Sequence, residues 1–265
     1  MLKRTTHALT AALRSGRKAW QETPAIDGMH IVEARPDIQA DDMARLSAVN
    51  GLTMTSVERR YALLQAVRHI QRWKIPGDIV ECGVWRGGSM ALVAHTLLET
   101  EDTTRTLWMY DTFTGMTQPG DMDCDHHGRP AKQLLAADTT PRTQSVLWAE
   151  ASLEDVRHTL SETGYPPEKM RFIAGPVEQT IPTDLPERIA LLRLDTDWYE
   201  STRHELAHLH GRVTSGGVVI VDDYGWWQGA RRAEDEFLAA CPEPILMHRV
   251  DETGRVWVKP GHSPS

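Results

Sequence analysis

The sequence predicts an α/β protein with a Rossmann-like, mostly parallel sheet, helices on both faces and an antiparallel hairpin at its C-terminal end. Three observations carry this prediction. Short apolar runs alternate with segments of helical periodicity, as βαβ units require. A glycine-rich turn joins the first apolar run to a helix. Two later runs each end in a pair of aspartates, at the strand ends where open α/β sheets bind ligands.

The elements follow one another in the order that a parallel sheet needs. Apolar residues three or four positions apart predict the helices, and continuous apolar runs predict the strands. Pro76-Gly77 ends the first long helix. The predicted helices cover residues 57–73, 90–98, 153–163 and 201–213. The predicted strands cover residues 78–84, 105–111, 170–174, 189–194 and 217–221.

Three further segments complete the predicted organisation. Residues 245–250 and 255–259 flank the turn 251–254 and predict an antiparallel pair that closes the sheet. Residues 114–143, which contain several Gly, Pro and Asp residues, predict a long loop, and loops of this length are usually functional or disordered. We therefore expect an N-terminal helical or cap extension over 1–56 and a Rossmann-like domain over 57–265.

Composition narrows the class of protein. The 265 residues carry a net charge of -8, which disfavours a nucleic-acid partner. Cys82, Cys124 and Cys241 are scattered without a CxxC spacing, which is typical of free thiols in a reducing, cytoplasmic setting. No apolar run is long enough to span a bilayer. The basic stretch 1–21 is interpreted as a surface helix on the core or on a second subunit of a homo-oligomer, in preference to a transit peptide or a membrane-bound helix.

A cofactor site is predicted at the first strand-to-helix turn. The pattern Glu81-x-Gly83-x-x-x-Gly87-Gly88-Ser89 lets the backbone approach a ligand closely, but it matches neither the dinucleotide fingerprint nor a phosphate loop. Asp111 ends the next strand, where a carboxylate commonly accepts hydrogen bonds from ribose. Together these features favour S-adenosylmethionine. The alternative is that the glycines serve only the turn geometry.

A metal site is predicted at the ends of two later strands. Asp195 and Asp197 lie two positions apart and so face the same side of a strand, and Asp222-Asp223 ends the next apolar run. Four carboxylates at adjacent strand tips would repel one another without a cation, and Mg²⁺ prefers such oxygen ligands. The ion would lower the pKa of an acceptor hydroxyl and orient it. The alternative reading makes each pair a helix cap or a turn.

A second metal motif is rejected. His204-Glu205-Leu206-Ala207-His208 matches the HExxH pattern of zinc proteases. The predicted helix lies between two core strands and covers a sheet face, with Leu206, Leu209 and Val213 as its apolar stripe. The histidines are therefore expected at the surface, without a zinc role.

Four motifs together resemble the macrocin O-methyltransferase family, over most of the chain from about Met54 to Phe237. They are Glu81–Ser89, Tyr110–Phe113, Leu194–Thr202 and Val221–Gly225. The resemblance implies a class I methyltransferase sheet, S-adenosylmethionine, a magnesium-type ion and a sugar hydroxyl as acceptor. It implies Asp195, Asp222 and Asp223 as metal ligands. It also implies a set of cofactor contacts: Met54, Ser56, Glu81, Gly83, Trp85, Arg86, Gly87, Gly88, Ser89, Asp111, Thr112 and Phe113.

The proton acceptor and the acceptor contacts are less closely defined. His127, in the long loop, and Asp197, beside the predicted metal, are rival general bases. Tyr199, Trp226 and Trp227 are candidate acceptor contacts, since aromatic faces stack on sugar rings, although Trp226-Trp227 could equally belong to the core or to an interface.

The sequence thus predicts a Mg-dependent O-methyltransferase that acts on a sugar hydroxyl of a glycosylated natural product or polysaccharide precursor. A catechol or phenol acceptor and a non-catalytic binding module are the alternatives.

Overall fold

The structure is a computed structural model that describes residues 35–242 and 244–261. The chain divides into two compact units, 1–39 and 40–265. In the first unit only a turn at 35–39 is described, where Ile38 N donates to Arg35 O at 3.1 Å. The basic stretch 1–21 lies outside the described residues.

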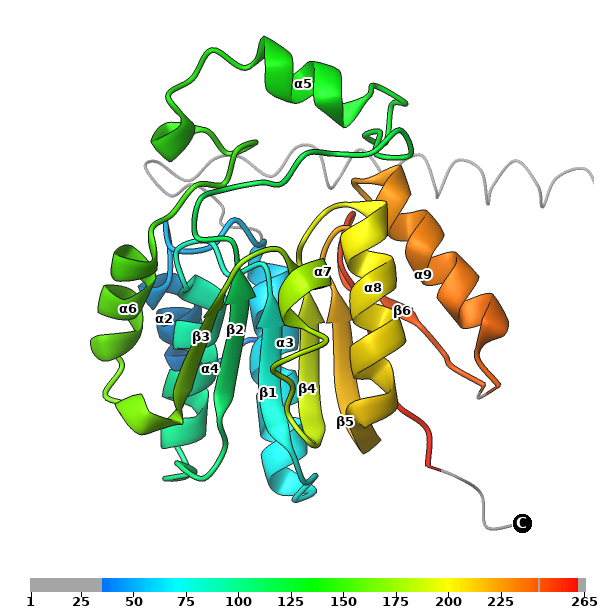
Figure 1. The fold of residues 1–265 in the computed structure, drawn as a ribbon. Coiled ribbons are helices and arrows are strands. Elements are labelled where there is room, and N and C mark those ends of the chain that lie inside the picture. The colour runs from blue at the N-terminus through cyan, green and yellow to red at the C-terminus, as the bar shows by residue number, and fades with distance from the viewer. Residues whose placement is uncertain (1–34, 243, 262–265) are drawn as a thin grey trace, which may run out of the picture. The chain divides into compact units, whose positions relative to one another are not determined.

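Seven strands of the described residues form one sheet in the order β3-β2-β1-β4-β5-β7-β6 (Figure 1). The first five run parallel to their neighbours, whereas β7 pairs antiparallel with both β5 and β6. This arrangement confirms the predicted fold class. The strands are β1 (Asp78–Cys82), β2 (Leu107–Asp111), β3 (Met170–Ala174), β4 (Ile189–Leu194), β5 (Val213–Val221), β6 (His248–Arg249) and β7 (Arg255–Val258).

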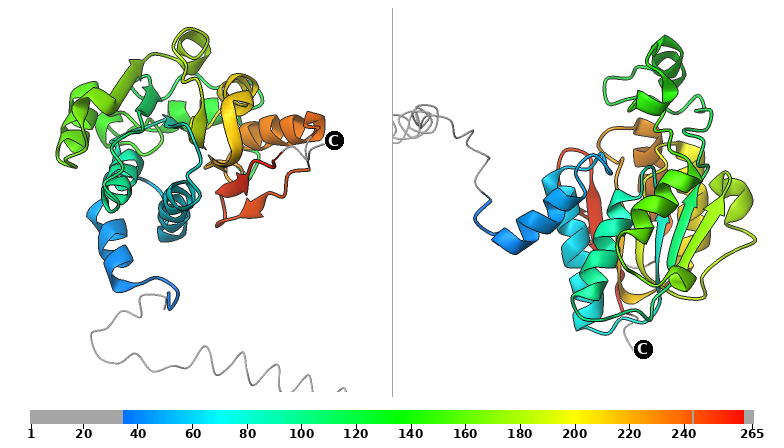
Figure 2. Two further views of the ribbon diagram at one scale, coloured as in Figure 1. Left: turned by 90° about the horizontal axis from the view of Figure 1, so that it is seen from below. Right: turned by 90° about the vertical axis from the view of Figure 1, so that its left-hand side faces the viewer.

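Helices cover both faces of the sheet (Figures 1 and 2). The helices α2, α3 and α4 lie on one face, with α6 against α4, and α7, α8 and α9 lie on the other. Short 3-10 turns occur at 142–144, 167–169 and 210–212. The helices are α2 (Ala40–Ala48), α3 (Val57–Arg72), α4 (Gly88–Leu98), α5 (Ala131–Ala137), α6 (Leu153–Ser161), α7 (Val177–Thr180), α8 (Tyr199–Leu209) and α9 (Gln228–Ala240).

The structure differs from the predicted elements in a few places. Residues 114–143 are not a continuous loop, because α5 and a 3-10 turn lie within them. Helices α7 and α9 were not predicted. The buried side of α9 consists mainly of small residues such as Ala230 and Ala233, which give a weak helical pattern. The strand β5 starts four positions before the predicted 217, because Gly216 and Gly217 interrupt its apolar run without ending it.

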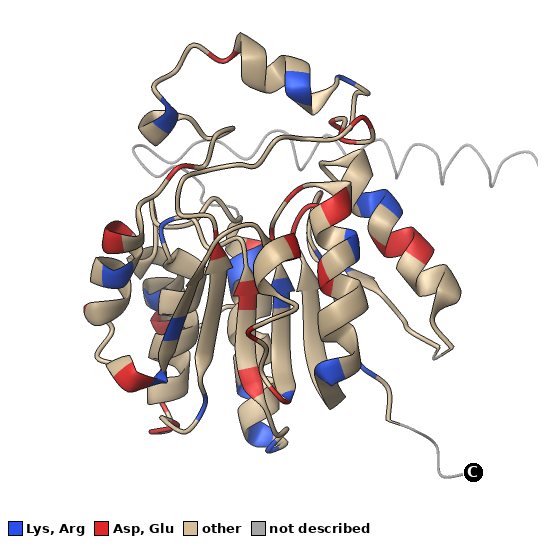
Figure 3. Ribbon diagram, in the orientation of Figure 1, with Lys and Arg blue, Asp and Glu red and all other residues tan. Residues whose placement is uncertain are grey.

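The core lies where the central strands meet the helices. All six residues of β4 are buried, as are the last five of β5 and the last four of β1. Each large apolar side chain buried there stabilises the fold by about 1.5–3 kcal/mol. Within the described residues, no helix combines the length and apolarity needed to cross a membrane. Acidic residues gather at the carboxyl ends of the central strands, beneath the segment that carries α5 (Figure 3).

Candidate active site

Two adjoining cavities open at the carboxyl ends of the parallel strands. The first, called the glycine-turn cavity, lies over the ends of β1, β2 and β3 and is lined by Gly83, Asp111 and Gly175 among others. The second, called the carboxylate cavity, is lined by Asp195, Asp197, Asp222 and Asp223 together with Arg59 and Arg193. Five residues line both cavities and mark their boundary: Met54, Trp85, Val146, Asp195 and Asp197.

The wall of the glycine-turn cavity is fixed by backbone geometry. Gly83 has φ +81°, and a Cβ added there would lie 1.9 Å from Asp195 O, so only glycine fits. Asp111 Oδ2 accepts from Val84 N at 2.7 Å and from Trp85 N at 3.1 Å, and its Oδ1 accepts from Phe113 N at 2.7 Å. Burial raises the pKa of Asp111, although these amide donors oppose the shift. One carboxylate therefore ties together the turns that follow β1 and β2.

The predicted cofactor residues divide between lining and support. Met54, Gly83, Trp85, Asp111 and Thr112 line the glycine-turn cavity. Ser89 lines the carboxylate cavity instead. The other predicted cofactor residues contact neighbouring protein groups. Ser56 caps α3, and Glu81 pairs with Arg193. Arg86 donates to Gly51 O and Thr143 O, Gly87 packs against Leu160 and Gly88 against Leu52, and Phe113 is buried.

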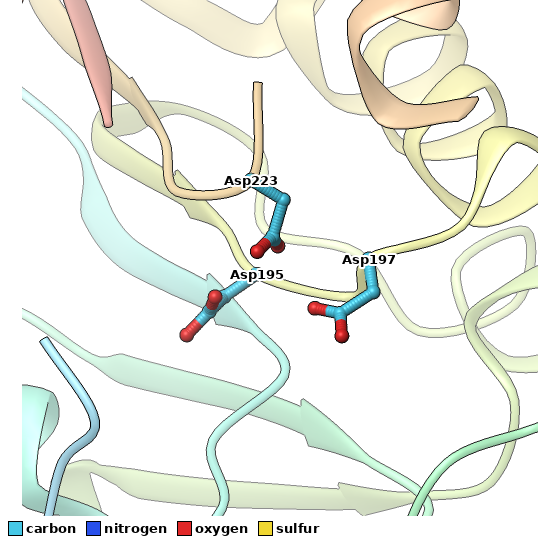
Figure 4. A group of neighbouring side chains, drawn as sticks. All are labelled: Asp195, Asp197 and Asp223. Carbon is cyan, nitrogen blue, oxygen red and sulfur yellow. The ribbon is translucent and has the colours of Figure 1, made fainter. Parts of the chain in front are cut away.

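Three carboxylates converge at the tips of β4 and β5. One oxygen from each of Asp195, Asp197 and Asp223 lies within 4.8 Å of the others, a spacing that suits a metal ion (Figure 4). Burial raises the pKa values of Asp195 and Asp223 well above the ordinary range, and neighbouring aspartates raise them further. Burial likewise raises the pKa of Asp197, to about 7. Arg193, 2.7 Å from Asp195, opposes the pKa shift of that residue, and further positive charge would stabilise the cluster.

Asp222 lies beside this cluster but faces two arginines. Arg193 Nη2 is 2.8 Å from Asp222 Oδ1, and Arg59 pairs with the other carboxylate oxygen. Arg193 also contacts Asp195 at 2.7 Å and Glu81 at 2.6 Å, and Arg59 contacts Asp251 at 2.9 Å. Of the predicted metal ligands, Asp195 and Asp223 thus meet in the cluster with Asp197, while both oxygens of Asp222 face arginines.

The rival proton acceptors lie in different surroundings. Asp197 lines both cavities, has φ +70°, and accepts from Trp227 Nε1 at 3.0 Å. His127 is exposed and lines neither cavity; its ring lies 3.9 Å from that of His126, centroid to centroid. The structure therefore brings Asp197, and not His127, to the boundary between the cavities.

The three residues predicted to contact the acceptor lie in different surroundings. Trp226 is 41% exposed and lines the carboxylate cavity, with the His126 ring 4.5 Å away. Trp227 lines the same cavity but is buried, with its edge against Trp198. Tyr199 lines neither cavity, and its hydroxyl donates to Glu236 Oε2 at 2.7 Å.

Apolar side chains surround the mouth of the carboxylate cavity. Met54, Val146 and Trp226 are 45%, 69% and 41% exposed, and all three line this cavity. An acidic floor beneath an apolar rim fits a ligand with a polar end and an apolar body.

The segment 114–143 is anchored over this site. Asp123 Oδ1 accepts from Tyr199 N, the first residue of α8, at 2.8 Å, and its Oδ2 accepts from Gly120 N at 2.7 Å. Gln228 N, at the start of α9, donates to Cys124 O at 2.8 Å. The segment is thus bound to the two helices that follow Asp197 and Asp223.

Several site residues were missed in the sequence. Arg193 carried a signal, since a charged residue inside a fully apolar strand needs a buried partner. Gly175-Pro176 follows β3 as Gly83 follows β1, which marks another strand-end turn. Arg59 gave no signal, because it lies in an ordinary helical pattern.

Comparisons with known proteins agree with this geometry. A family model described as Macrocin-O-methyltransferase (TylF) matches residues 9–259. The chain is 34% identical over 208 residues to demethyldecarbamoylnovobiocin O-methyltransferase of Streptomyces niveus, covering 78% of this chain and 76% of that protein. It is 34% identical over 205 residues to a tetracenomycin 4'-O-methyltransferase of Streptomyces olivaceus that acts on a dimethoxy-rhamnosyl derivative, covering 77% and 74%. The solved structure of the O-methyltransferase NovP matches with a TM-score of 0.69 and 31% identity, covering 79% of this chain and 83% of that one.

Proposed function

Because this chain belongs to the macrocin-O-methyltransferase family, we propose that it methylates a sugar hydroxyl of a glycosylated natural product with S-adenosylmethionine as methyl donor. The family resemblance read from the motifs is confirmed. One observation carries the proposal: a cavity built on a glycine turn adjoins a cavity floored by aspartates, and Asp195 and Asp197 line both. Donor and acceptor can therefore meet at that boundary.

The glycine-turn cavity is proposed to hold S-adenosylmethionine. Asp111 accepts three backbone hydrogen bonds, and the Thr112 hydroxyl, 3.5 Å from Oδ1, has a closer acceptor in Gly115 O at 2.6 Å. Since an ionised carboxylate has about four lone-pair sites, capacity remains for a ribose hydroxyl. Gly83 lets the backbone approach the ligand closely, and Met54 and Trp85 provide apolar contact at the boundary.

The carboxylate cavity is proposed to hold Mg²⁺ or a similar ion. Four aspartates line it against two arginines, so the donor set suits a divalent cation with oxygen ligands. We assign Asp195, Asp222 and Asp223 as ligands, following the family resemblance, and the proximity of Asp195 to Asp223 supports two of the three. A bound ion would polarise and orient the acceptor hydroxyl.

Asp197 is proposed as the proton acceptor in preference to His127. It lies at the boundary of the two cavities, where the acceptor oxygen must meet the methyl group, and Trp227 Nε1 fixes one of its oxygens. When the methyl group leaves the sulfonium sulfur of the donor for the acceptor oxygen, with neutral S-adenosylhomocysteine as the leaving group, Asp197 would take up the hydroxyl proton. His127 is exposed and lies outside both cavities.

The apolar rim favours a glycoside over the other acceptors. Met54, Val146 and Trp226 offer contact to an apolar aglycone, while a hydroxylated sugar would reach the acidic floor. A polysaccharide precursor would leave this rim without an apolar partner, and a small catechol would not reach it.

The first test is turnover of S-adenosylmethionine to S-adenosylhomocysteine with a pooled glycoside panel and a catechol panel, with Mg²⁺ and with EDTA. We expect turnover with glycosides only, abolished by EDTA. Turnover that survives EDTA would overturn the ion assignment. Turnover with catechols alone would overturn the acceptor class. Absence of cofactor binding by calorimetry would overturn the methyltransferase proposal and favour a binding module.

A second test separates the two candidate third ligands. Asp222→Asn should weaken Mn²⁺ binding, measured by calorimetry, at least tenfold. Asp197→Asn should leave Mn²⁺ affinity within threefold and abolish turnover. If Asp197→Asn weakens Mn²⁺ binding and Asp222→Asn does not, Asp197 is the third ligand. That result would agree with the convergence of Asp195, Asp197 and Asp223.

A further inference from the structure

Glu205 is a buried acid of α8 that the proposed function does not use. It is the glutamate of the HExxH pattern, but its side chain is fully buried, on the same side of the helix as Leu206 and Leu209. His208, by contrast, is exposed, with its Nδ1 2.8 Å from His204 O. The motif thus presents its glutamate to the protein interior, where an acid needs a specific partner.

The partner of Glu205 lies in the turn that carries the site aspartates. Thr196 Oγ1 donates to Glu205 Oε1 at 2.9 Å. The other carboxylate oxygen, Oε2, has no hydrogen-bond partner among the described residues. Thr196 stands between Asp195 and Asp197 in the chain, so this hydrogen bond joins α8 to the middle of the turn beyond β4.

Other contacts also restrain the turn. Arg193 lies 2.7 Å from Asp195, Trp227 Nε1 donates to Asp197 at 3.0 Å, and Ser201 Oγ donates to Thr196 O at 3.3 Å, but none of them holds the Thr196 side chain. Asp195 N donates to Cys82 O at 2.8 Å, and Trp198 N donates to Thr196 O at 2.8 Å. Asp197 has φ +70°, a left-handed conformation that a non-glycine residue keeps only when its surroundings enforce it. Because Thr196 stands between Asp195 and Asp197, holding its side chain at Glu205 restrains the backbone from which both aspartates project.

We propose that Glu205 is a positioning residue, which through Thr196 sets the directions in which Asp195 and Asp197 face the cavities. The catalytic consequence of this proposal rests on the proposed function, whereas the structural link between Glu205 and the turn does not. A buried acid with a merely structural role would stabilise α8 against the sheet without affecting the order of the turn.

The test uses the full-length chain, four single variants and the double variant Glu205→Leu/Thr196→Val. Glu205→Leu removes the acceptor, and Thr196→Val removes the donor while nearly keeping the volume of the side chain. Glu205→Gln keeps a carbonyl oxygen that can accept from Thr196, so it is the conservative variant that should restore the link. His208→Ala is the matched control, because this residue lies on the exposed side of the same helix.

Two measurements are made on each variant. Hydrogen exchange followed by mass spectrometry should show the Trp198 amide region exchanging at least tenfold faster in Glu205→Leu and Thr196→Val. At saturating substrates, kcat should fall at least tenfold in both, with KM for the methyl donor within threefold. Glu205→Gln and His208→Ala should stay within threefold of the parent in both measurements. In the double variant Glu205→Leu/Thr196→Val, kcat should fall no further than in either single variant, because both substitutions remove the same hydrogen bond.

The outcomes are distinct. Exchange and kcat unchanged in both Glu205→Leu and Thr196→Val would overturn the proposal, as would an equal loss in Glu205→Gln and Glu205→Leu. If Glu205→Leu does not fold, Thr196→Val alone decides. If the parent chain turns over no substrate, the proposed function fails, while the exchange data still test the link between Glu205 and the turn.

Discussion

The two cavities of this site differ in what they are made from. The glycine-turn cavity owes its shape to the backbone: Gly83 permits close approach, and Asp111 is held by three main-chain amides. The carboxylate cavity owes its character to side-chain charge, with four aspartates and two arginines. One half is held by main-chain hydrogen bonds, and the other is short of positive charge.

This difference indicates how binding and catalysis are divided between the two cavities. A wall made of backbone keeps its shape whether or not a ligand is bound, so the methyl donor should bind a preformed site. A cluster of like charges is stable only when they are neutralised, and burial raises the pKa values of Asp195, Asp197 and Asp223. Binding should therefore depend on the first cavity, and catalysis on the second.

Asp195→Ala gives the largest expected effect and tests this division directly. The substitution removes a carboxylate from the charged half and leaves the glycine turn intact. We expect kcat to fall by about 10²–10³-fold or more, the loss typical of removing one group that stabilises a transition state. The affinity for S-adenosylhomocysteine, measured by calorimetry, should stay within threefold.

The control for this variant is Asp121→Ala, which removes an exposed aspartate from the segment 114–143. It should change neither quantity. A parallel loss of kcat and cofactor affinity in Asp195→Ala would show that the two cavities do not divide the work.

Gly83→Ala should disrupt both cavities at once. A methyl group there would lie 1.9 Å from Asp195 O, so the turn after β1 must move away from β4. Overpacking together with the left-handed φ of +81° should cost about 2–4 kcal/mol of unfolding free energy. Chemical denaturation measures this loss. Gly164→Ala is the matched control, since its φ is +75° but its Cβ would meet no atom within 4 Å. Equal losses in the two variants would attribute the effect to φ alone.

Asp111→Asn should affect only the backbone-built half. The amide NH₂ cannot accept a hydrogen bond, so at least one of the backbone donors, from Val84, Trp85 or Phe113, loses its acceptor, at a cost of about 1–3 kcal/mol. Cofactor affinity should fall about tenfold or more, while kcat at saturating cofactor stays within threefold. An unchanged dissociation constant would remove Asp111 from the cofactor site.

The backbone-built half could be predicted from sequence at the turns after β1 and β2, but not at the turn after β3, where Gly175-Pro176 was missed. Glycines at a strand end and an acid at the end of the next strand are each visible within a few residues of the chain, so Gly83 and Asp111 were found where they lie. Most strands and helices, though not α5, α7 and α9, were found for the same reason, because apolar runs and turns are local signals. Even the limits of β3 and β4 agree with the predicted ranges.

The charged half could be predicted only in part. The aspartates were found, but the pairing of Asp222 with Arg59 depends on a contact between residues 163 positions apart, which no local pattern encodes. The direction of Trp227 toward Asp197 and the exposure of His127 likewise depend on how the segment 114–143 packs. Local sequence predicts which groups reach a site, whereas long-range packing decides how they face it.

Asp251→Asn gives the smallest expected effect. It tests whether Arg59 contributes to the charged cavity or only to the hairpin of β6 and β7. Arg59 lies between Asp222 and Asp251, and Ser56 Oγ donates to Asp251 Oδ2 at 2.6 Å. Burial raises the pKa of Asp251, but hydrogen bonds from Ser56, Gly254 and Thr253 and the charge of Arg59 outweigh it and lower the pKa to about 2. A depressed carboxyl pKa stabilises the fold above the unfolded value of 3.8, and this contribution is lost as the pH falls toward about 2.

At pH 7 we therefore expect Asp251→Asn to lose about 1–2 kcal/mol of unfolding free energy, after allowance for solvent screening. The difference from the parent should shrink between about pH 4 and pH 2, which denaturant titrations across this range would measure. If Arg59 mainly holds the β6–β7 hairpin in place, kcat should hardly change. If kcat falls as well, Arg59 must be held at Asp251 to balance the charge of Asp222, and the hairpin then contributes to the charged half of the site.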